Sequence, residues 1–176
     1  DLIKSEKLGR IVAVKGNVTW DRDEKYYSDD WHGTLDKEGG GVIINQCIHT
    51  LALIQWLVDD EVISVDGSIS QKRLKGKVET EDTADALISF SNGVQALFYG
   101  TLCYKSNSSV FLEILFEKGK AVMYDDLVVT DENGNVTEIV DSYPRIILTN
   151  SHDGFNSFKF MVGPLRLVWS NGLVLC

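Results

Sequence analysis

A run of apolar residues from Val42 to Val58, entered through three glycines, is the strongest constraint on the fold. Its apolar side chains recur on most sides of a 3.6-residue period, which predicts a helix covered over most of its surface. Asn45 and His49 stand at positions i and i+4 and would share one face of this helix. Since buried polar groups need hydrogen-bond partners, the pair either bonds internally or faces a cavity where a ligand supplies the partner. The glycines at 39–41 let another backbone or a substrate approach closely, and they leave free N–H groups at the helix N-terminus.

Most of the remaining chain carries strand signals. Residues 10–20 predict a first strand with a bend or bulge at Gly16. Short turn-like links, such as Ser91-Asn92-Gly93, indicate antiparallel neighbours. Because several strands are apolar on both faces, we expect an α+β fold whose predominantly antiparallel sheet has helices on one face and an open face for oligomerisation. The strands predicted after the helix are 62–70, 84–90, 94–104, 110–116, 121–124, 127–130 and 137–140.

Length and composition narrow the classes of function. A chain of 176 residues with 44% hydrophobic composition is long enough for one domain. Its formal net charge of −9 argues against a nucleic-acid partner, which needs a basic face. No apolar stretch reaches the roughly 20 residues that span a bilayer, so no membrane partner is expected. The three cysteines have no zinc or disulfide spacing and, with no signal peptide, favour a cytoplasmic protein.

A polar loop at 21–41 is longer than most structureless connections, and its aromatic rings argue against disorder. Its acidic residues at 21–30 do not have the spacing of a calcium loop, so we expect no metal site.

Several motifs, in this order and spacing, resemble those of one enzyme family. Over roughly residues 1–125 the chain is similar to the C-terminal domain of the glucose-fructose oxidoreductase and inositol dehydrogenase (Gfo/Idh/MocA) family. The resemblance implies the open-faced sheet of dihydrodipicolinate reductase-like C-terminal domains. It also implies an NAD(P)-dependent oxidoreductase that acts on sugars, inositols or similar polyols. The motifs are Arg22, Tyr26-Tyr27, Trp31-His32-Gly33-Thr34, the segment 39–51, Glu81-Asp82-Thr83-Ala84 and Ser91-Asn92-Gly93.

In that family an N-terminal Rossmann domain holds NAD or NADP, and the C-terminal domain supplies substrate contacts and the oligomer interface. The phosphate loop and the Glu-Lys-Pro lysine of that first domain have no counterpart here, so the chain alone is expected to bind no cofactor and to be inactive. We expect residues 1–176 to form one substrate-binding and oligomerisation domain. Within it, 1–8 would end a truncated linker helix and 142–176 would form an atypical tail. The expected partners are a sugar or polyol, the missing Rossmann domain and further copies of the chain.

The resemblance maps the family's substrate pair onto Asn45 and His49, with His49 as the catalytic residue that helps proton transfer. The alternative for His49 is a core histidine satisfied by the backbone, and for Asn45 a helix-capping or packing amide. Ala52 replaces the family's carboxylate one turn beyond the histidine, which leaves the imidazole without that orienting group.

The other candidate substrate contacts lie in the polar loop 21–41. Trp31 and Tyr26 offer ring faces to the C–H groups of a sugar, although loop anchoring would use them equally well. Arg22 either binds an anionic substituent or only solvates the loop. A non-catalytic dimerisation or carbohydrate-binding module is the alternative function.

Overall fold

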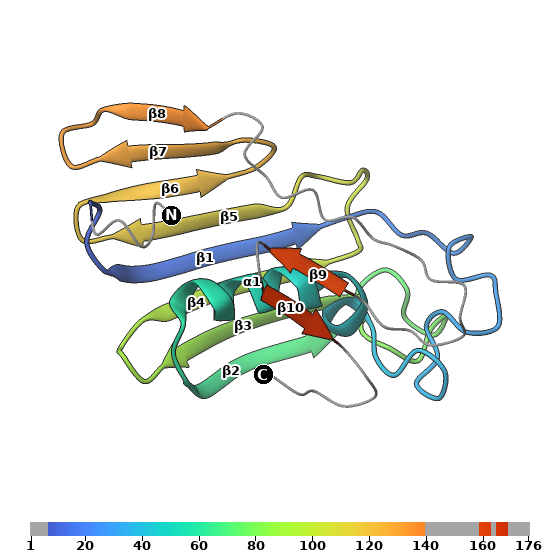
Figure 1. The fold of residues 1–176 in the computed structure, drawn as a ribbon. Coiled ribbons are helices and arrows are strands. Elements are labelled where there is room, and N and C mark those ends of the chain that lie inside the picture. The colour runs from blue at the N-terminus through green and yellow to red at the C-terminus, as the bar shows by residue number, and fades with distance from the viewer. Residues whose placement is uncertain (1–6, 140–158, 163–164, 169–176) are drawn as a thin grey trace. The chain divides into compact units, whose positions relative to one another are not determined.

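The structure is a computed structural model that describes residues 7–139, 159–162 and 165–168 (Figure 1). The chain divides into two compact units, 1–140 and 141–176. In the second unit two short strands, β9 (Lys159–Val162) and β10 (Leu165–Val168), pair antiparallel. Most of the predicted linker helix 1–8 and most of the predicted tail lie outside the described residues, and residues 7–8 form a turn.

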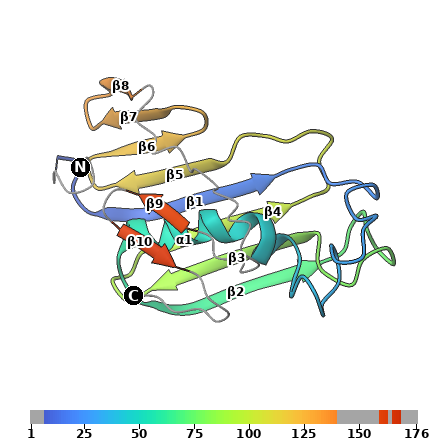
Figure 2. The same ribbon diagram turned by 45° about the vertical axis from the view of Figure 1, so that its right-hand side comes forward.

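An eight-stranded mixed sheet forms the first unit (Figures 1 and 2). The strand order is β2-β3-β4-β1-β5-β6-β7-β8, and every neighbouring pair is antiparallel except β1 and β4. All of the predicted strands are confirmed, and the largest error is at the end of β4, which stops at Thr101 instead of Tyr104. The strands are β1 (Ile11–Thr19), β2 (Val62–Ser70), β3 (Thr83–Phe90), β4 (Gln95–Thr101), β5 (Phe111–Phe116), β6 (Gly119–Met123), β7 (Leu127–Asp131) and β8 (Val136–Ile139).

The predicted bend or bulge at Gly16 is wrong. The register of β1 shifts between Ile11 and Ala13, whereas Gly16 continues a regular ladder between Phe98 and Leu112. A Cβ at position 16 would lie 3.2 Å from Cδ1 of Ile54 in the helix. The glycine therefore lets the helix pack closely on the sheet and does not bend the strand.

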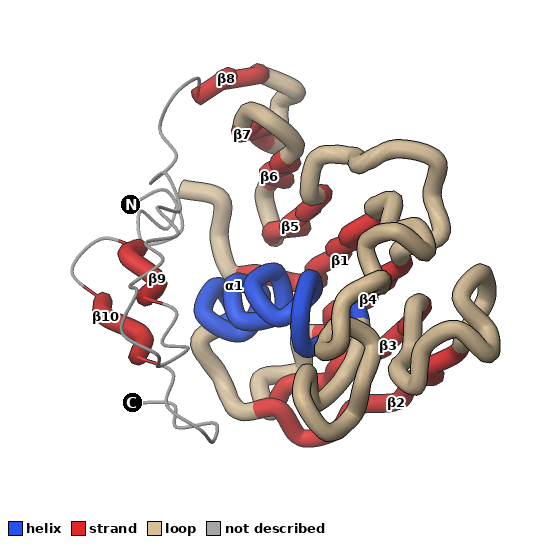
Figure 3. Tube along the Cα trace, turned by 90° about the vertical axis from the view of Figure 1, so that its right-hand side faces the viewer, coloured by secondary structure: helices blue, strands red, loops and turns tan. Residues whose placement is uncertain are grey.

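The predicted helix is confirmed and lies on one face of the sheet (Figure 3). It begins as a π-helix, η2 (Ile43–Cys47), and continues as α1 (Ile48–Val58). It ends at Asp59, whose backbone is left-handed and whose N–H donates to the Gln55 carbonyl oxygen at 3.0 Å. Cys47 and Ile54 are fully buried against the sheet, and burial raises the pKa of the Cys47 thiol to about 12. The part of the chain that the structure describes contains no second helix.

The opposite face of the sheet is partly apolar and exposed. Leu87, Leu97, Tyr99 and Leu115 point to this face because they alternate with core residues along β3, β4 and β5, and they are 37–53% exposed. Lys15 and Glu113 occupy the same face at paired positions of β1 and β5. We call these six residues the open face.

Candidate functional site

The candidate site lies at the end of the sheet where β1, β2 and β4 finish (Figure 1). These three strands run in one direction, so the loops that follow them meet at one edge. The polar loop 21–41 follows β1, and residues 102–110 follow β4. The backbone N–H groups of Trp20 and Arg22 bond to the carbonyl oxygens of Thr101 and Leu102 at 2.9 and 3.1 Å. The start of the polar loop is therefore fixed to the end of β4.

Glu81 holds the N-terminus of the helix. Its carboxylate accepts the backbone N–H groups of Gly41 and Ile43 at about 3.1 Å, and its carbonyl oxygen accepts that of Val42 at 3.0 Å. A Cβ at Gly41 would overlap the Glu81 carbonyl oxygen. The expectation of free N–H groups at the helix N-terminus is thus wrong for Gly41 and Ile43, because an internal carboxylate accepts both. The close approach predicted for the glycines occurs at Gly41, where backbone meets backbone.

The neighbouring Asp82 organises the loop between β2 and β3. Its fully buried carboxylate accepts backbone N–H groups from Lys72, Arg73 and Leu74 at 2.8–3.1 Å and the Thr83 hydroxyl at 2.9 Å. Burial alone would raise the pKa of Asp82, but these hydrogen bonds outweigh it and the pKa is lowered.

The guanidinium of Arg73 connects the loop held by Asp82 to the polar loop. It donates to the Asp21 carboxylate at 2.6 Å, to the Arg22 carbonyl oxygen, and to the Tyr104 carbonyl oxygen at 3.0 Å. Glu81 and Asp82, adjacent in sequence, therefore position both the helix and the loop that carry the candidate site residues.

The side chain of Asn45 is engaged within the protein. Its amide nitrogen donates to the Glu38 carboxylate, which also accepts the backbone N–H of Gly33. Glu38 and burial together raise the pKa of the Tyr27 hydroxyl, with burial the larger cause. Asn45 is thus joined to the polar loop through Glu38, a residue that the sequence analysis did not single out.

His49 lies on α1, partly buried. Burial lowers the pKa of its imidazole, so the ring is neutral at physiological pH. It shares a helical stripe with Leu53 and Trp56, and Trp56 is 40% exposed. His49 therefore lies on the side of the helix that faces away from the sheet.

The remaining candidates are Arg22, Tyr26 and Trp31, which lie in a row of flat side chains with Trp20 and His32. We call these five residues the loop stack. The Arg22 guanidinium lies 5.1 Å from the ring of Trp20 and 5.0 Å from that of Tyr26. The ring centroids of Tyr26 and His32 are 4.5 Å apart, and those of His32 and Trp31 are 3.7 Å apart. The ring of Tyr26 is thus occupied by protein neighbours, whereas Trp31 remains 42% exposed.

Gln46 links the helix to the loop stack, a role that was not predicted from the sequence. Its amide nitrogen lies 3.5 Å from the Tyr26 hydroxyl, and the residue is only 6% exposed. The available signal was its place beside Asn45, in the first turn of a helix that is otherwise apolar.

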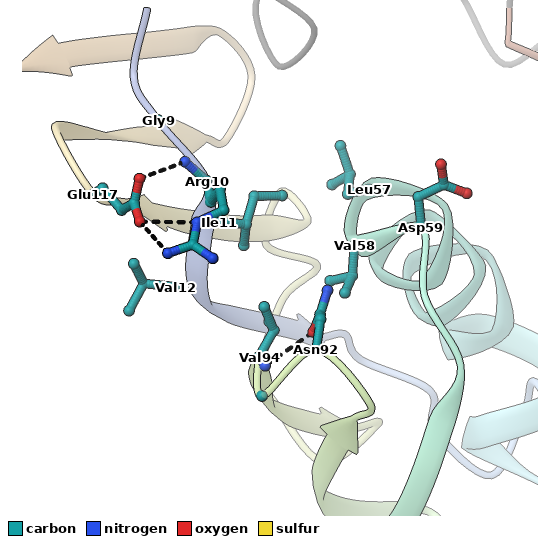
Figure 4. Close-up of a pocket in the computed structure, with 11 residues that line it drawn as sticks. Gly9, Arg10, Ile11, Val12, Leu57, Val58, Asp59, Asn92, Val94 and Glu117 are labelled. Carbon is teal, nitrogen blue, oxygen red and sulfur yellow. Dashed lines mark hydrogen bonds and ion pairs between the residues drawn. The ribbon is translucent and has the colours of Figure 1, made fainter. Parts of the chain in front are cut away.

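A hollow lies elsewhere, beside the C-terminal end of α1 (Figure 4). It is an open groove of about 720 Å³, closed on one side by the ion pair of Arg10 with Glu117 at 2.8 Å. None of the predicted site residues lines it. Its lining is Gly9, Arg10, Ile11, Val12, Leu57, Val58, Asp59, Asn92, Gly93, Val94 and Glu117.

The described residues contain no cluster of three or more His, Cys, Asp or Glu side chains suited to a metal ion. Among them no helix is both long enough and apolar enough to span a membrane.

Comparison with known proteins gave two family matches. Residues 1–122 match the GFO/IDH/MocA C-terminal domain, and residues 106–176 match a domain of unknown function, DUF932. No curated protein matches the chain.

Solved structures match the first unit. The WlbA dehydrogenase from Bordetella pertussis, in complex with NADH and UDP-GlcNAcA, is 32% identical with a TM-score of 0.61, over 68% of this chain and 36% of that one. The WlbA dehydrogenase from Chromobacterium violaceum is 30% identical with a TM-score of 0.61, over 68% and 34%. Levoglucosan dehydrogenase with NADH and levoglucosan shares the fold, at 21% identity and a TM-score of 0.68 over 78% and 41%. The chain thus spans about two fifths or less of the length of these enzymes.

Proposed function

Since its match over residues 1–122 shows that this chain belongs to the GFO/IDH/MocA oxidoreductase family, we propose that it is the substrate-binding and oligomerisation half of an NAD(P)-dependent oxidoreductase acting on a sugar or polyol. The observation that carries the proposal is the place of Asn45 and His49 on a helix whose N-terminus Glu81 fixes at the same end of the sheet as the loop stack.

His49 is proposed as the proton acceptor. When an alcohol is oxidised to a carbonyl, the hydroxyl proton must leave as the carbon loses its hydride, and a positioned neutral imidazole accepts that proton. Asn45 and Trp31 are proposed to contact substrate hydroxyls and ring C–H groups, respectively.

The described residues do not fit a nicotinamide dinucleotide. Dinucleotide folds bind the pyrophosphate at a glycine-rich helix N-terminus, but here Glu81 places a carboxylate on the amides of Gly41 and Ile43. We therefore assign NAD or NADP to a Rossmann domain outside this chain.

Ligand titrations followed by nuclear magnetic resonance test this proposal. Adding D-glucose or myo-inositol should shift the backbone amide signals around Asn45 and His49, because these residues are proposed to line the substrate site. The signals of Asn92 and Gly93, in the groove at the far end of α1, serve as the control and should not move. NAD and NADP should shift none of these signals. Sugar-induced signal shifts confined to Asn92 and Gly93, or signal shifts caused by NAD, would contradict the proposed substrate site.

A dimerisation module is the second candidate function, favoured by the exposed apolar side chains of the open face. We expect sedimentation to show a dimer or higher oligomer at tens of micromolar, and Leu97→Asp to give a monomer because it places a charge in the centre of this face. Leu35→Asp, at an exposed position in the polar loop, is the matched control and should leave the assembly unchanged. A monomeric wild-type chain would rule out this role.

A further inference from the structure

Two buried polar atoms without partners adjoin the side chain of Tyr26. In the part of the chain that the structure describes, Nε of Arg22 and Oε1 of Gln46 are the buried side-chain atoms that lack a hydrogen-bond partner. The Arg22 guanidinium lies 5.0 Å from the centre of the Tyr26 ring, and the Gln46 amide nitrogen lies 3.5 Å from the Tyr26 hydroxyl. Because unsatisfied buried polar atoms are costly and rare in folded proteins, two at one side chain point to a missing binding partner.

The charge of Arg22 is not neutralised by the described residues. Its Nη1 donates to the Asp21 carbonyl oxygen at 2.7 Å and to the Asn107 side-chain oxygen at 3.1 Å, and both acceptors are neutral. The nearby carboxylate of Asp21 is paired with Arg73 at 2.6 Å. Arg22 makes no ion pair with any described carboxylate. Its buried Nε therefore lacks an acceptor, and the two oxygens of an oxyanion would match the planar fork of the guanidinium.

Gln46 requires a different kind of group. Its Nε2 contact with the Tyr26 hydroxyl is at the limit of a hydrogen bond, and its Oε1 has no donor. If the amide were turned over, the unpartnered atom would be a donor instead. A hydroxyl satisfies either arrangement, since it both donates and accepts.

We propose that Arg22 and Gln46 form a subsite for the oxyanion and a neighbouring hydroxyl of an acidic sugar. The oxyanion is a carboxylate or a phosphate. This inference rests on the proposed function and narrows its substrate class from sugars and polyols in general to acidic sugars. Tyr26 lies between the two groups, with its ring beside the Arg22 guanidinium and its hydroxyl 3.5 Å from the Gln46 amide nitrogen.

Three sugars that differ only at C6 test the subsite: D-glucose, D-glucuronate and D-glucose 6-phosphate. Calorimetry on the complete chain at constant ionic strength is expected to show at least one acidic sugar binding about tenfold tighter than D-glucose, the ratio that one charge-assisted hydrogen bond supplies. Preference for D-glucuronate identifies a carboxylate site, and preference for D-glucose 6-phosphate identifies a phosphate site.

Variants at Arg22 separate charge from geometry. Arg22→Gln should remove the preference for the acidic sugar over D-glucose. Arg22→Lys keeps the charge but not the planar edge, and it should retain part of this preference. Arg10→Gln is the matched control, because Arg10 is exposed and paired with Glu117 in the groove, and it should keep the full preference.

The outcomes distinguish this inference from the proposed function. Equal binding of all three sugars by the wild-type chain, or an unchanged preference in Arg22→Gln, overturns the acidic-sugar subsite and leaves the proposed function standing. Failure of all three sugars to bind overturns both.

Discussion

Replacing His49 with alanine in the proposed full-length oxidoreductase is expected to lower kcat by about 10² or more, the usual contribution of a positioned acid–base group. Burial lowers the pKa of this partly buried imidazole, so the substitution would remove the proposed proton acceptor without removing a charge at neutral pH. Steady-state kinetics on each accepted sugar or polyol measures the effect. An unchanged kcat/KM would show that His49 is structural.

Two companion variants make this test specific. Asn45→Ala should mainly raise KM, because the amide is proposed to recognise a hydroxyl and not to transfer a proton. Ala52→Asp should increase activity if a carboxylate one turn from His49 orients the ring, as the resemblance implies. Thermal melting must show that the His49→Ala protein remains folded, since an unfolded variant would show that the histidine is needed for folding.

Replacing Asp82 with alanine is expected to lower the free energy of unfolding by about 3–5 kcal/mol, the scale seen when one partner of a buried charged network is removed. The substitution leaves the N–H groups of residues 72–74 and the Thr83 hydroxyl without their acceptor. Asp85→Ala is the control, because Asp85 is exposed and bonds only to the Ser68 hydroxyl; it should change the free energy by less than about 1 kcal/mol. Equal urea midpoints for the two variants would contradict a stabilising role of the Asp82 carboxylate.

The same carboxylate makes stability depend on pH in a defined direction. The pKa of Asp82 is lower in the folded protein than in the unfolded chain, where it is about 3.9. Its contribution is therefore complete above that unfolded value and is lost as the pH falls through the lower folded value. Acid titrations of wild type and Asp82→Ala should converge in stability at low pH.

The sequence predicted the strands well because each was bounded by local turn signals. It could not predict which strands flank β1, since the pairing of β1 with β4 and β5 joins segments about 80–100 residues apart and leaves no local pattern. Gly16 was misread for a related reason: its role depends on Ile54 of the helix, a tertiary neighbour.

The candidate site was predicted less completely. The positions of Asn45, His49 and Tyr26 followed from motif spacing, and their roles remain predictions. Glu81 and Gln46 were part of the quoted motifs, but their roles were not predicted, because a carboxylate on helix amides and an amide beside a phenol are visible only once the loop and the helix are brought together.

The position of β1 has a consequence for how the protein is made. As the first strand of the described chain and the centre of the sheet, β1 leaves the ribosome about 75 residues before β4 begins and about 90 before β5 begins. Its backbone must therefore stay unpaired through much of synthesis, and the sheet closes late through contacts distant in sequence, which slows folding. We expect the nascent chain to need protection by chaperones until Phe116 has emerged, and truncations before β5 to aggregate.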